Sequence, residues 1–80
     1  MRGNMEKRIV KIKTSPVELY KILKFENIAS SGGEAKHMIA NGFVKVNKGT
    51  ETRKRKKIYP GDTIETAGIV LEIQLQEKQG

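Results

Sequence analysis

Regular alternation of apolar and polar residues predicts several strands. Isoleucine or leucine occupies every second position from 69 to 75, which is the two-residue period of a half-buried strand. Residues 7–13 alternate less strictly, with Val10 and Ile12 on the same side. Lysines along this segment favour the edge of a sheet, because they discourage pairing with other molecules. Residues 63–66 predict a third, shorter strand.

The first helix is predicted over residues 16–25. Ser15 and Glu18 have the spacing of a capping box, in which each side chain satisfies a backbone N–H group of the other. Pro16 suits the first helical position, where its missing N–H group costs nothing. Phe25, at the end of this helix, is expected to join the core between the helices. The apolar stripe of the helix consists of Leu19, Ile22 and Leu23.

A second helix is predicted to begin after Ser31 and to end before Gly42. Ser31 and Glu34 form another capping box, and a glycine just past the last periodic residue ends a helix without steric cost. A strand over residues 43–46 and a hairpin turn over 47–49 follow, since asparagine and glycine tolerate the positive φ of such turns. The apolar stripe of this helix consists of Ala35, Met38 and Ile39.

These elements predict an α+β fold: a two-helix pair packed on a small, mainly antiparallel, twisted β-sheet. Eighty residues leave room for one domain, which we place at 7–76 between flexible tails at 1–6 and 77–80. The chain has no cysteine, so neither disulfides nor thiolate metal sites stabilise it. The predicted core consists of Leu19, Ile22, Leu23, Met38, Ile39, Val44, Val46, Ile64, Leu71 and Ile73.

Positive charge is concentrated in the first part of the chain. Residues 1–57 hold 15 of the 16 Lys and Arg, but only five of the nine Asp and Glu. Such segregation is typical of a face that binds a polyanion. Nucleic acid is the favoured partner, and an anionic membrane surface is a distant second. The N-terminus lacks the apolar stretch of a signal peptide, so we expect a cytoplasmic protein.

Five consecutive basic residues from Arg53 to Lys57 allow three interpretations. The run could be a solvated loop, a nuclear-import signal, which such runs often match by accident, or a ribbon that binds phosphates. In an extended ribbon Arg53, Arg55 and Lys57 would project to one side, and Lys54 and Lys56 to the other. Because arginine offers a planar fork that binds phosphate through two hydrogen bonds, we favour the phosphate-binding interpretation.

The start of the second helix adds a candidate phosphate site. Gly32 and Gly33 offer unpaired N–H groups at the positive end of the helix dipole, although two glycines could equally serve to let two helices approach closely. Lys36 lies one turn into this helix and off its apolar stripe, while Lys45 and Lys48 flank the hairpin turn. Lys36 is either an ordinary exposed residue or a further phosphate contact, and we expect Lys45 and Lys48 to be additional phosphate contacts.

No catalytic or metal-binding constellation stands out in the sequence. His37 is the only histidine, and neither a second imidazole nor a cluster of cysteines or carboxylates lies at ligand spacing. We therefore expect no enzyme activity, no metal and no cofactor. Two Phe and two Tyr are too few for a base-stacking platform, and Tyr59 and Phe43 would stack one base at most. Recognition of folded or double-helical RNA by its shape and phosphates is the expected mode.

The order of these motifs resembles the small RNA-binding domain of the ribosomal protein S-four type, known as the alpha-L motif. The resemblance covers residues 16–75 and includes the second helix with Gly42, the Val-x-Val-Asn of residues 44–47, and the Pro-Gly-Asp-x-Ile of residues 60–64. The Ser-Gly-Gly-x-Ala-Lys of residues 31–36 is similar to the stand-alone bacterial YbcJ-like subfamily.

The resemblance implies a non-enzymatic protein that binds ribosomal or transfer RNA and associates with ribosomal particles. The wider family typically carries an arginine where this chain has Gly32, and Lys36 is the candidate to supply that charge. The alternative is an adaptor that docks an acidic protein through the same surface; a small RNA hydrolase lacks its acid–base residues. We expect a monomer. The predicted RNA-binding residues are Gly32, Gly33, Lys36, Lys45, Lys48, Arg53, Lys54, Arg55, Lys56 and Lys57.

Overall fold

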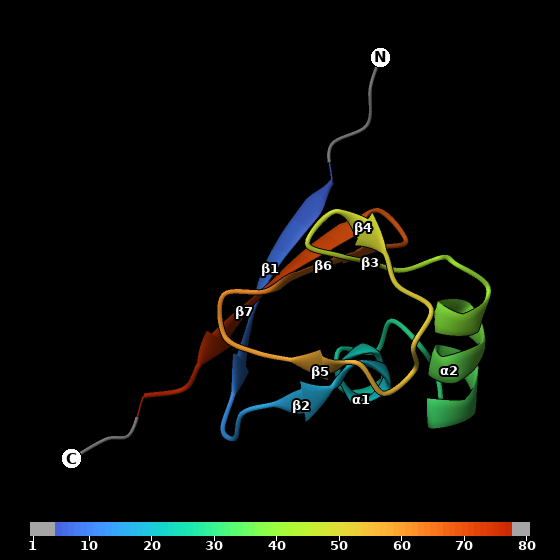
Figure 1. Ribbon diagram of the computed structural model, residues 1–80. Coiled ribbons are helices and arrows are strands. Elements are labelled where there is room, and N and C mark those ends of the chain that lie inside the picture. The colour runs from blue at the N-terminus through green and yellow to red at the C-terminus, as the bar shows by residue number, and fades with distance from the viewer. Residues whose placement is uncertain (1–4, 78–80) are drawn as a thin grey trace.

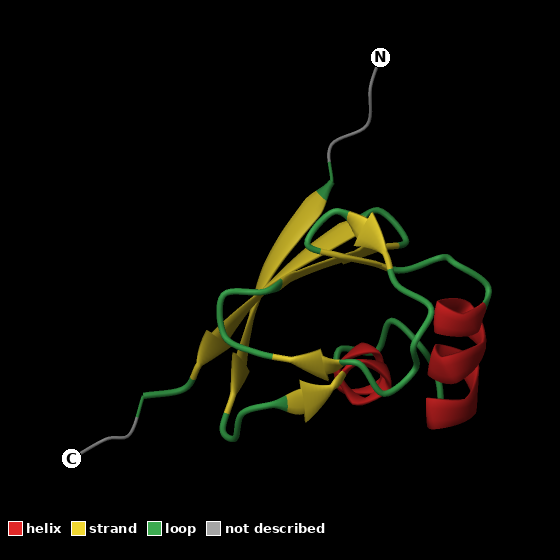
Figure 2. Cartoon of the chain, viewed as in Figure 1, coloured by secondary structure: helices red, strands yellow, loops and turns green. Residues whose placement is uncertain are grey.

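The computed structural model describes residues 5–77, which form two sheets and two helices (Figures 1 and 2). A five-stranded sheet has the order β1-β7-β6-β3-β4, and a small second sheet pairs β2 with β5. Neither described helix is long and apolar enough to cross a membrane. The elements are β1 (Glu6–Ile12), β2 (Val17–Glu18), α1 (Leu19–Phe25), α2 (Gly32–Ala40), β3 (Lys45–Val46), β4 (Gly49–Thr50), β5 (Lys57–Ile58), β6 (Thr63–Thr66) and β7 (Ile69–Leu75).

The larger sheet is mainly antiparallel, as predicted. β6 pairs with β7, and β3 pairs with both β4 and β6, all in antiparallel fashion. β1 lies at the sheet edge, as its lysines predict, but it pairs with β7 in parallel, from Glu6 opposite Ile69 to Ile12 opposite Leu75. The alternation of side chains indicates which face of a strand is buried. It does not indicate the direction of the neighbouring strand, so the parallel pairing was not predicted.

Helix α1 begins at Leu19, and the predicted capping box of Ser15 and Glu18 is wrong. The two residues before the helix form β2 instead, which pairs with β5. Glu18 is the N-cap residue but makes no side-chain hydrogen bond to the helix. The first two N–H groups of α1 donate to backbone carbonyls in the loop before β5. The start of α1 is thus capped by a segment that is distant in sequence and not by a local side chain.

Helix α2 has the ends that the sequence predicts. The Ser31 hydroxyl accepts a hydrogen bond from the Glu34 N–H at 3.1 Å. The Glu34 carboxylate reaches one residue further back than in a capping box, where it accepts from the N–H and the hydroxyl of Ser30, each at 2.6 Å. At the other end Gly42 has a φ of +80°. Its N–H and that of the next residue donate to last-turn carbonyls, which is the Schellman arrangement.

The core forms where the helices pack on the sheet, and it contains the predicted residues with one exception: Met38 is only partly buried. The placement of Phe25 in the core is wrong, because its side chain is 67% exposed. The helical period places Glu26, not Phe25, next on the apolar stripe of α1. Phe25 is rotated from Glu26 by about 100° around the helix axis, so its side chain points away from the core. Ile58 of β5 is fully buried. Its place in the core was not predicted, because it follows five basic residues and shows no apolar periodicity with them.

We predict that Gly42→Ala lowers the free energy of unfolding by about 1–2 kcal/mol, the cost of a left-handed conformation with a Cβ. The added Cβ would meet only Thr50 Cγ2 at 3.7 Å, so the change tests backbone strain alone. Urea unfolding measures it. Gly33→Ala is the matched control, because its Cβ would meet only Ser31 Oγ at 3.8 Å and alanine favours a helix. Equal losses in both variants would contradict the role of Gly42.

Candidate nucleic-acid interface

The five basic residues 53–57, here called the basic loop, form a turn. The Lys56 N–H donates to the Arg53 carbonyl at 3.2 Å, and the chain turns at residues 54 and 55 before it enters β5. The extended ribbon that we predicted, with side chains alternating between two sides, is therefore wrong. The turn is favoured because it brings two carbonyls of the loop within hydrogen-bonding distance of α1.

Those two carbonyls fix the basic loop against the start of α1. The Leu19 N–H donates to the Lys56 carbonyl at 2.9 Å, and the Tyr20 N–H donates to the Lys54 carbonyl at 3.2 Å. Beside these bonds β2 pairs with β5, and Figure 1 shows the two short strands next to α1. The basic side chains therefore project from a backbone that the fold holds in place.

Tyr20 is the residue at which the helix pair and the basic loop meet. The Lys36 ammonium of α2 lies 4.6 Å from the centre of the Tyr20 ring, and the Arg55 guanidinium lies 5.5 Å from it. Both distances are within the range of a cation–π contact. A Cβ on Gly32 would lie 3.6 Å from the same ring, so the start of α2 also packs closely here. We call Tyr20, Gly32, Lys36 and Arg55 the Tyr20 cluster.

No direct sign of this role for Tyr20 is present in the sequence, where the residue flanks the apolar stripe of its helix. The only indication is its position as the second residue of α1. A partly buried aromatic ring at this position can contact a segment that packs on the start of the helix. Lys36, proposed from the sequence as a phosphate contact, lies close to the basic loop, because Lys36 and Arg55 both contact the Tyr20 ring.

Arg53 forms a two-point ion pair with Glu51. Arg53 Nε lies 2.8 Å from Oε2 and Nη2 lies 3.1 Å from Oε1. These guanidinium hydrogen bonds are the main reason that the pKa of Glu51 falls from 4.5 to about 2. A guanidinium carries five N–H donors, and the Arg53 side chain is 70% exposed. Arg53 therefore keeps donors for an incoming phosphate while Glu51 fixes its orientation.

Arg55 has a weaker acidic neighbour. Its Nη1 lies 3.6 Å from Glu18 Oε1, and Lys21 Nζ lies 3.6 Å from the same oxygen. Exposed ion pairs of this kind are worth about 0–1 kcal/mol, and the Arg55 side chain is 63% exposed. Because Glu18 divides its single charge between Arg55 and Lys21, a backbone phosphate, which carries the same charge, can replace it beside Arg55 at low cost.

The N-terminus of α2 already holds an anionic group. The Glu34 carboxylate accepts hydrogen bonds from the Ser30 hydroxyl and N–H, and these bonds lower the pKa of Glu34. A carboxylate at this point competes with a phosphate for the positive end of the helix dipole. A Cβ on Gly32 would make only ordinary contact with the Tyr20 ring at 3.6 Å, and one on Gly33 would meet only Ser31 Oγ at 3.8 Å, so neither position requires glycine for close packing. A phosphate contact by Gly32 and Gly33 stays a prediction.

Lys45 and Lys48 lie apart from the Tyr20 cluster. Both are exposed residues of the β3–β4 hairpin, which Figure 1 shows well separated from α1 and β5. Asn47 and Lys48 have φ values of 51° and 72°, as the predicted hairpin turn requires. The predicted RNA-binding residues thus fall into two groups, one around the basic loop and one on the hairpin. The contribution of the hairpin lysines stays a prediction.

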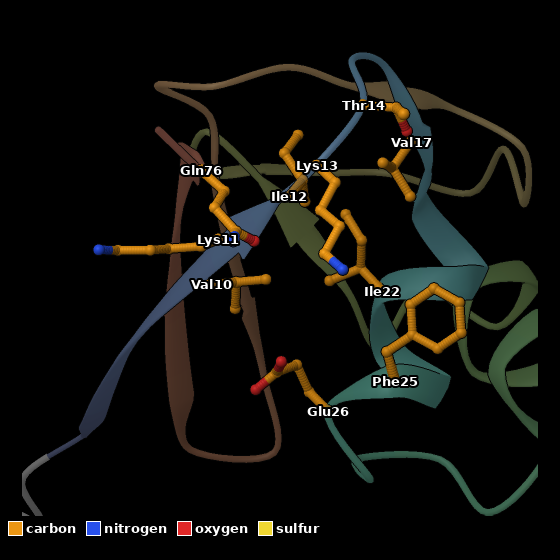
Figure 3. Close-up of a pocket in the computed structure, with 10 residues that line it drawn as sticks. All are labelled: Val10, Lys11, Ile12, Lys13, Thr14, Val17, Ile22, Phe25, Glu26 and Gln76. Atoms are coloured by element: carbon orange, nitrogen blue, oxygen red, sulfur yellow. The ribbon is translucent and has the colours of Figure 1, made fainter. Parts of the chain in front are cut away.

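A separate hollow of about 320 Å³ lies between β1 and α1 (Figure 3). Phe25 lines it, while Figure 3 shows the Lys11 side chain directed away from Phe25. No residue of the basic loop lines this hollow, so it does not extend the cationic surface. Among residues 5–77 no group of three His, Cys, Asp or Glu could hold a metal ion. The apolar lining consists of Val10, Ile12, Val17, Ile22 and Phe25.

We predict that Glu51→Gln lowers the free energy of unfolding at pH 7 by about 0.5–1 kcal/mol, as expected for a partly exposed ion pair. The folded-state pKa of Glu51 is depressed to about 2, so its contribution is present above pH 4.5 and is lost as the pH falls towards 2. Urea unfolding across this range should show the two proteins converging in acid. A gap that is constant with pH would contradict the ion pair as its cause.

Comparison with known proteins identifies the family. A model of the S4 domain matches residues 10–74. The chain is 47% identical over 57 residues to YbcJ, a candidate RNA-binding protein of Escherichia coli (strain K12), across 71% of this chain and 81% of YbcJ. It is 34% identical over 60 residues to RlbA of Bacillus subtilis (strain 168), named for an inferred role in ribosome maturation, across 75% of this chain and 84% of RlbA.

The fold agrees with that assignment. A solution structure of E. coli YbcJ, described as revealing an αL motif involved in RNA binding, matches with a TM-score of 0.62 and 40% identity over 92% of both chains. The two helices and the mainly antiparallel sheet of this protein are therefore the α+β arrangement that its motifs predict. On the family match and on these relatives, the chain belongs to the S4 domain family.

Proposed function

We propose that this protein is a non-enzymatic RNA-binding protein that contacts the phosphates of folded or double-helical RNA through the basic loop and the Tyr20 cluster. The observation that carries the proposal is the meeting of Lys36 and Arg55 over Tyr20, at 4.6 and 5.5 Å. The contact joins cations from α2 and from the loop into one surface. A dense group of like charges is unfavourable by itself, and a polyanion relieves the repulsion.

The exposed aromatic residues support recognition of RNA by shape. Phe25, Phe43 and Tyr59 are all exposed, but each lines a different hollow. Successive stacking of several bases requires neighbouring rings, and these rings do not form such a platform. Contacts to the phosphates of an A-form helix need no stacked bases, and the fixed backbone of the basic loop suits a rigid target.

The relatives support the class of RNA. RNA binding is attributed to YbcJ and ribosome maturation to RlbA. We therefore propose ribosomal or transfer RNA as the ligand, ribosomal particles as the associated assembly, and the cytoplasm as the location. The alternative is an adaptor that docks an acidic protein on the same cations. RNA that copurifies with the protein and is removed by nuclease argues against the adaptor.

The first test of this proposal is the salt dependence of binding. If about five phosphates are neutralised, log affinity for a structured RNA should fall with log salt at a slope of about −3.5 to −4.5. Filter binding with a ribosomal RNA hairpin between low and moderate salt gives the slope. A slope near zero would remove the electrostatic mechanism.

The second test separates phosphate contacts from sequence readout. Arg53→Ala combined with Arg55→Ala should weaken binding to all structured RNAs similarly, by roughly tenfold, and should reduce the salt slope by about 2, since each lost phosphate contact removes about 1. The matched control is Lys11→Ala combined with Lys13→Ala. It removes the same charge from two exposed lysines at or just after the edge strand β1. Loss of binding to only one RNA sequence, or equal losses in both double variants, would count against the proposal.

A further inference from the structure

A hollow of about 460 Å³ opens at the basic loop. Four of its lining side chains are cationic and one is aromatic; we call it the Tyr59 hollow. Arg55 belongs both to this hollow and to the Tyr20 cluster, so the hollow is continuous with the proposed phosphate-binding surface. Its lining residues are Arg53, Arg55, Lys56, Lys57 and Tyr59.

Tyr59 is held in this position by the turn that follows it. Its N–H donates to Asp62 Oδ2 at 2.8 Å, and the Asp62 N–H donates back to the Tyr59 carbonyl at 3.0 Å. Asn47 Nδ2 donates to the other Asp62 oxygen at 3.0 Å, and the preceding residue, Ile58, is fully buried. Tyr59 as a whole is nevertheless 49% exposed. An exposed aromatic side chain therefore projects from a backbone that is fixed before any ligand binds.

The other exposed aromatic residues lack these surroundings. Phe43 lines a smaller hollow of about 200 Å³ in which Glu65 offsets the charge of Lys45. Phe25 lines the hollow between β1 and α1 and a second hollow of about 510 Å³, and each of these contains two lysines and one glutamate. Among the exposed aromatic residues that the structure describes, Tyr59 alone shares a hollow with several cations and no carboxylate. This combination suits a ligand with one aromatic group and adjacent negative charge.

We propose that the Tyr59 hollow binds one unpaired nucleotide that adjoins a double-helical segment of the RNA. The base stacks on the Tyr59 ring, and the arginines and lysines around it hold the flanking phosphates. The inference rests on the proposed function and deepens it, because it names the RNA class: a duplex with a bulged or overhanging nucleotide.

The physical argument follows from what a duplex exposes. Bases inside a helix are stacked on each other, so away from the helix ends a single protein ring can stack only on a base that has left the helix. One exposed ring accommodates one base, which excludes a long single strand as the best ligand. Arg53 can hold the adjacent phosphate because its pair with Glu51 uses only part of its donors and fixes its direction.

Two RNA duplexes of the same sequence test the proposal, one blunt-ended and fully paired and one with a single bulged aminopurine, a fluorescent adenine analogue. The wild-type protein should bind the bulged RNA roughly tenfold more tightly, as one stacked base allows, and should quench its fluorescence. Tyr59→Ala should bind both RNAs with the affinity that the wild type has for the paired one. Tyr59→Phe should keep the preference, and Phe43→Ala is the control for an exposed ring elsewhere.

Tyr59→Leu provides a second variant that keeps apolar bulk without an aromatic ring, and it should also lose both preference and quenching. Equal wild-type affinities for the two RNAs would overturn the inference, as would a Tyr59→Ala change that weakens both RNAs equally. These outcomes differ from failure of the proposed function, in which neither RNA shows salt-dependent binding. Unaltered thermal unfolding of the variants assigns any loss to the hollow and not to the fold.

Discussion

Two backbone hydrogen bonds, from the N–H groups of Leu19 and Tyr20 to the carbonyls of Lys56 and Lys54, hold both the fold and the site together. The first N–H groups of any helix have no partner within that helix, and here the basic loop supplies one for each of the first two. Because the acceptor carbonyls belong to the basic loop, the same bonds also fix the position of its cationic side chains. Opening the loop would leave the start of α1 unsatisfied, so the position of the cations is coupled to the stability of the helix pair.

Concentrating cations on a surface is unfavourable, and the structure offsets the cost locally. Arg53 is paired with Glu51, Arg55 lies near Glu18, and Tyr20 offers the negative face of its ring to Lys36 and Arg55. None of these contacts encloses its cation. They orient flexible side chains while leaving the two arginines exposed and Lys36 half-buried, which reduces the entropy that a ligand must remove when it binds.

The sequence predicted those features whose partners lie nearby in the chain. The ends of α2, the hairpin turn at Asn47 and the inward faces of the strands depend on residues within a few positions of each other, and the structure has them. The start of α1 was wrong because its partners come from the basic loop, far along the chain. The turn within that loop was missed for the same reason. Charge density did indicate the basic region, but neither the role of Tyr20 nor the separation of Lys45 and Lys48 from it follows from local spacing.

The parallel pairing of β1 with β7 has a consequence for how the protein is made. β1 is synthesised first and β7 last among the strands, yet each residue of β1 lies opposite a residue of β7. Closing so long a segment of chain carries an entropic cost that no contact offsets until both strands are present. The sheet therefore cannot be completed on a growing chain before β7 has left the ribosome. Until then β1 has no strand to pair with.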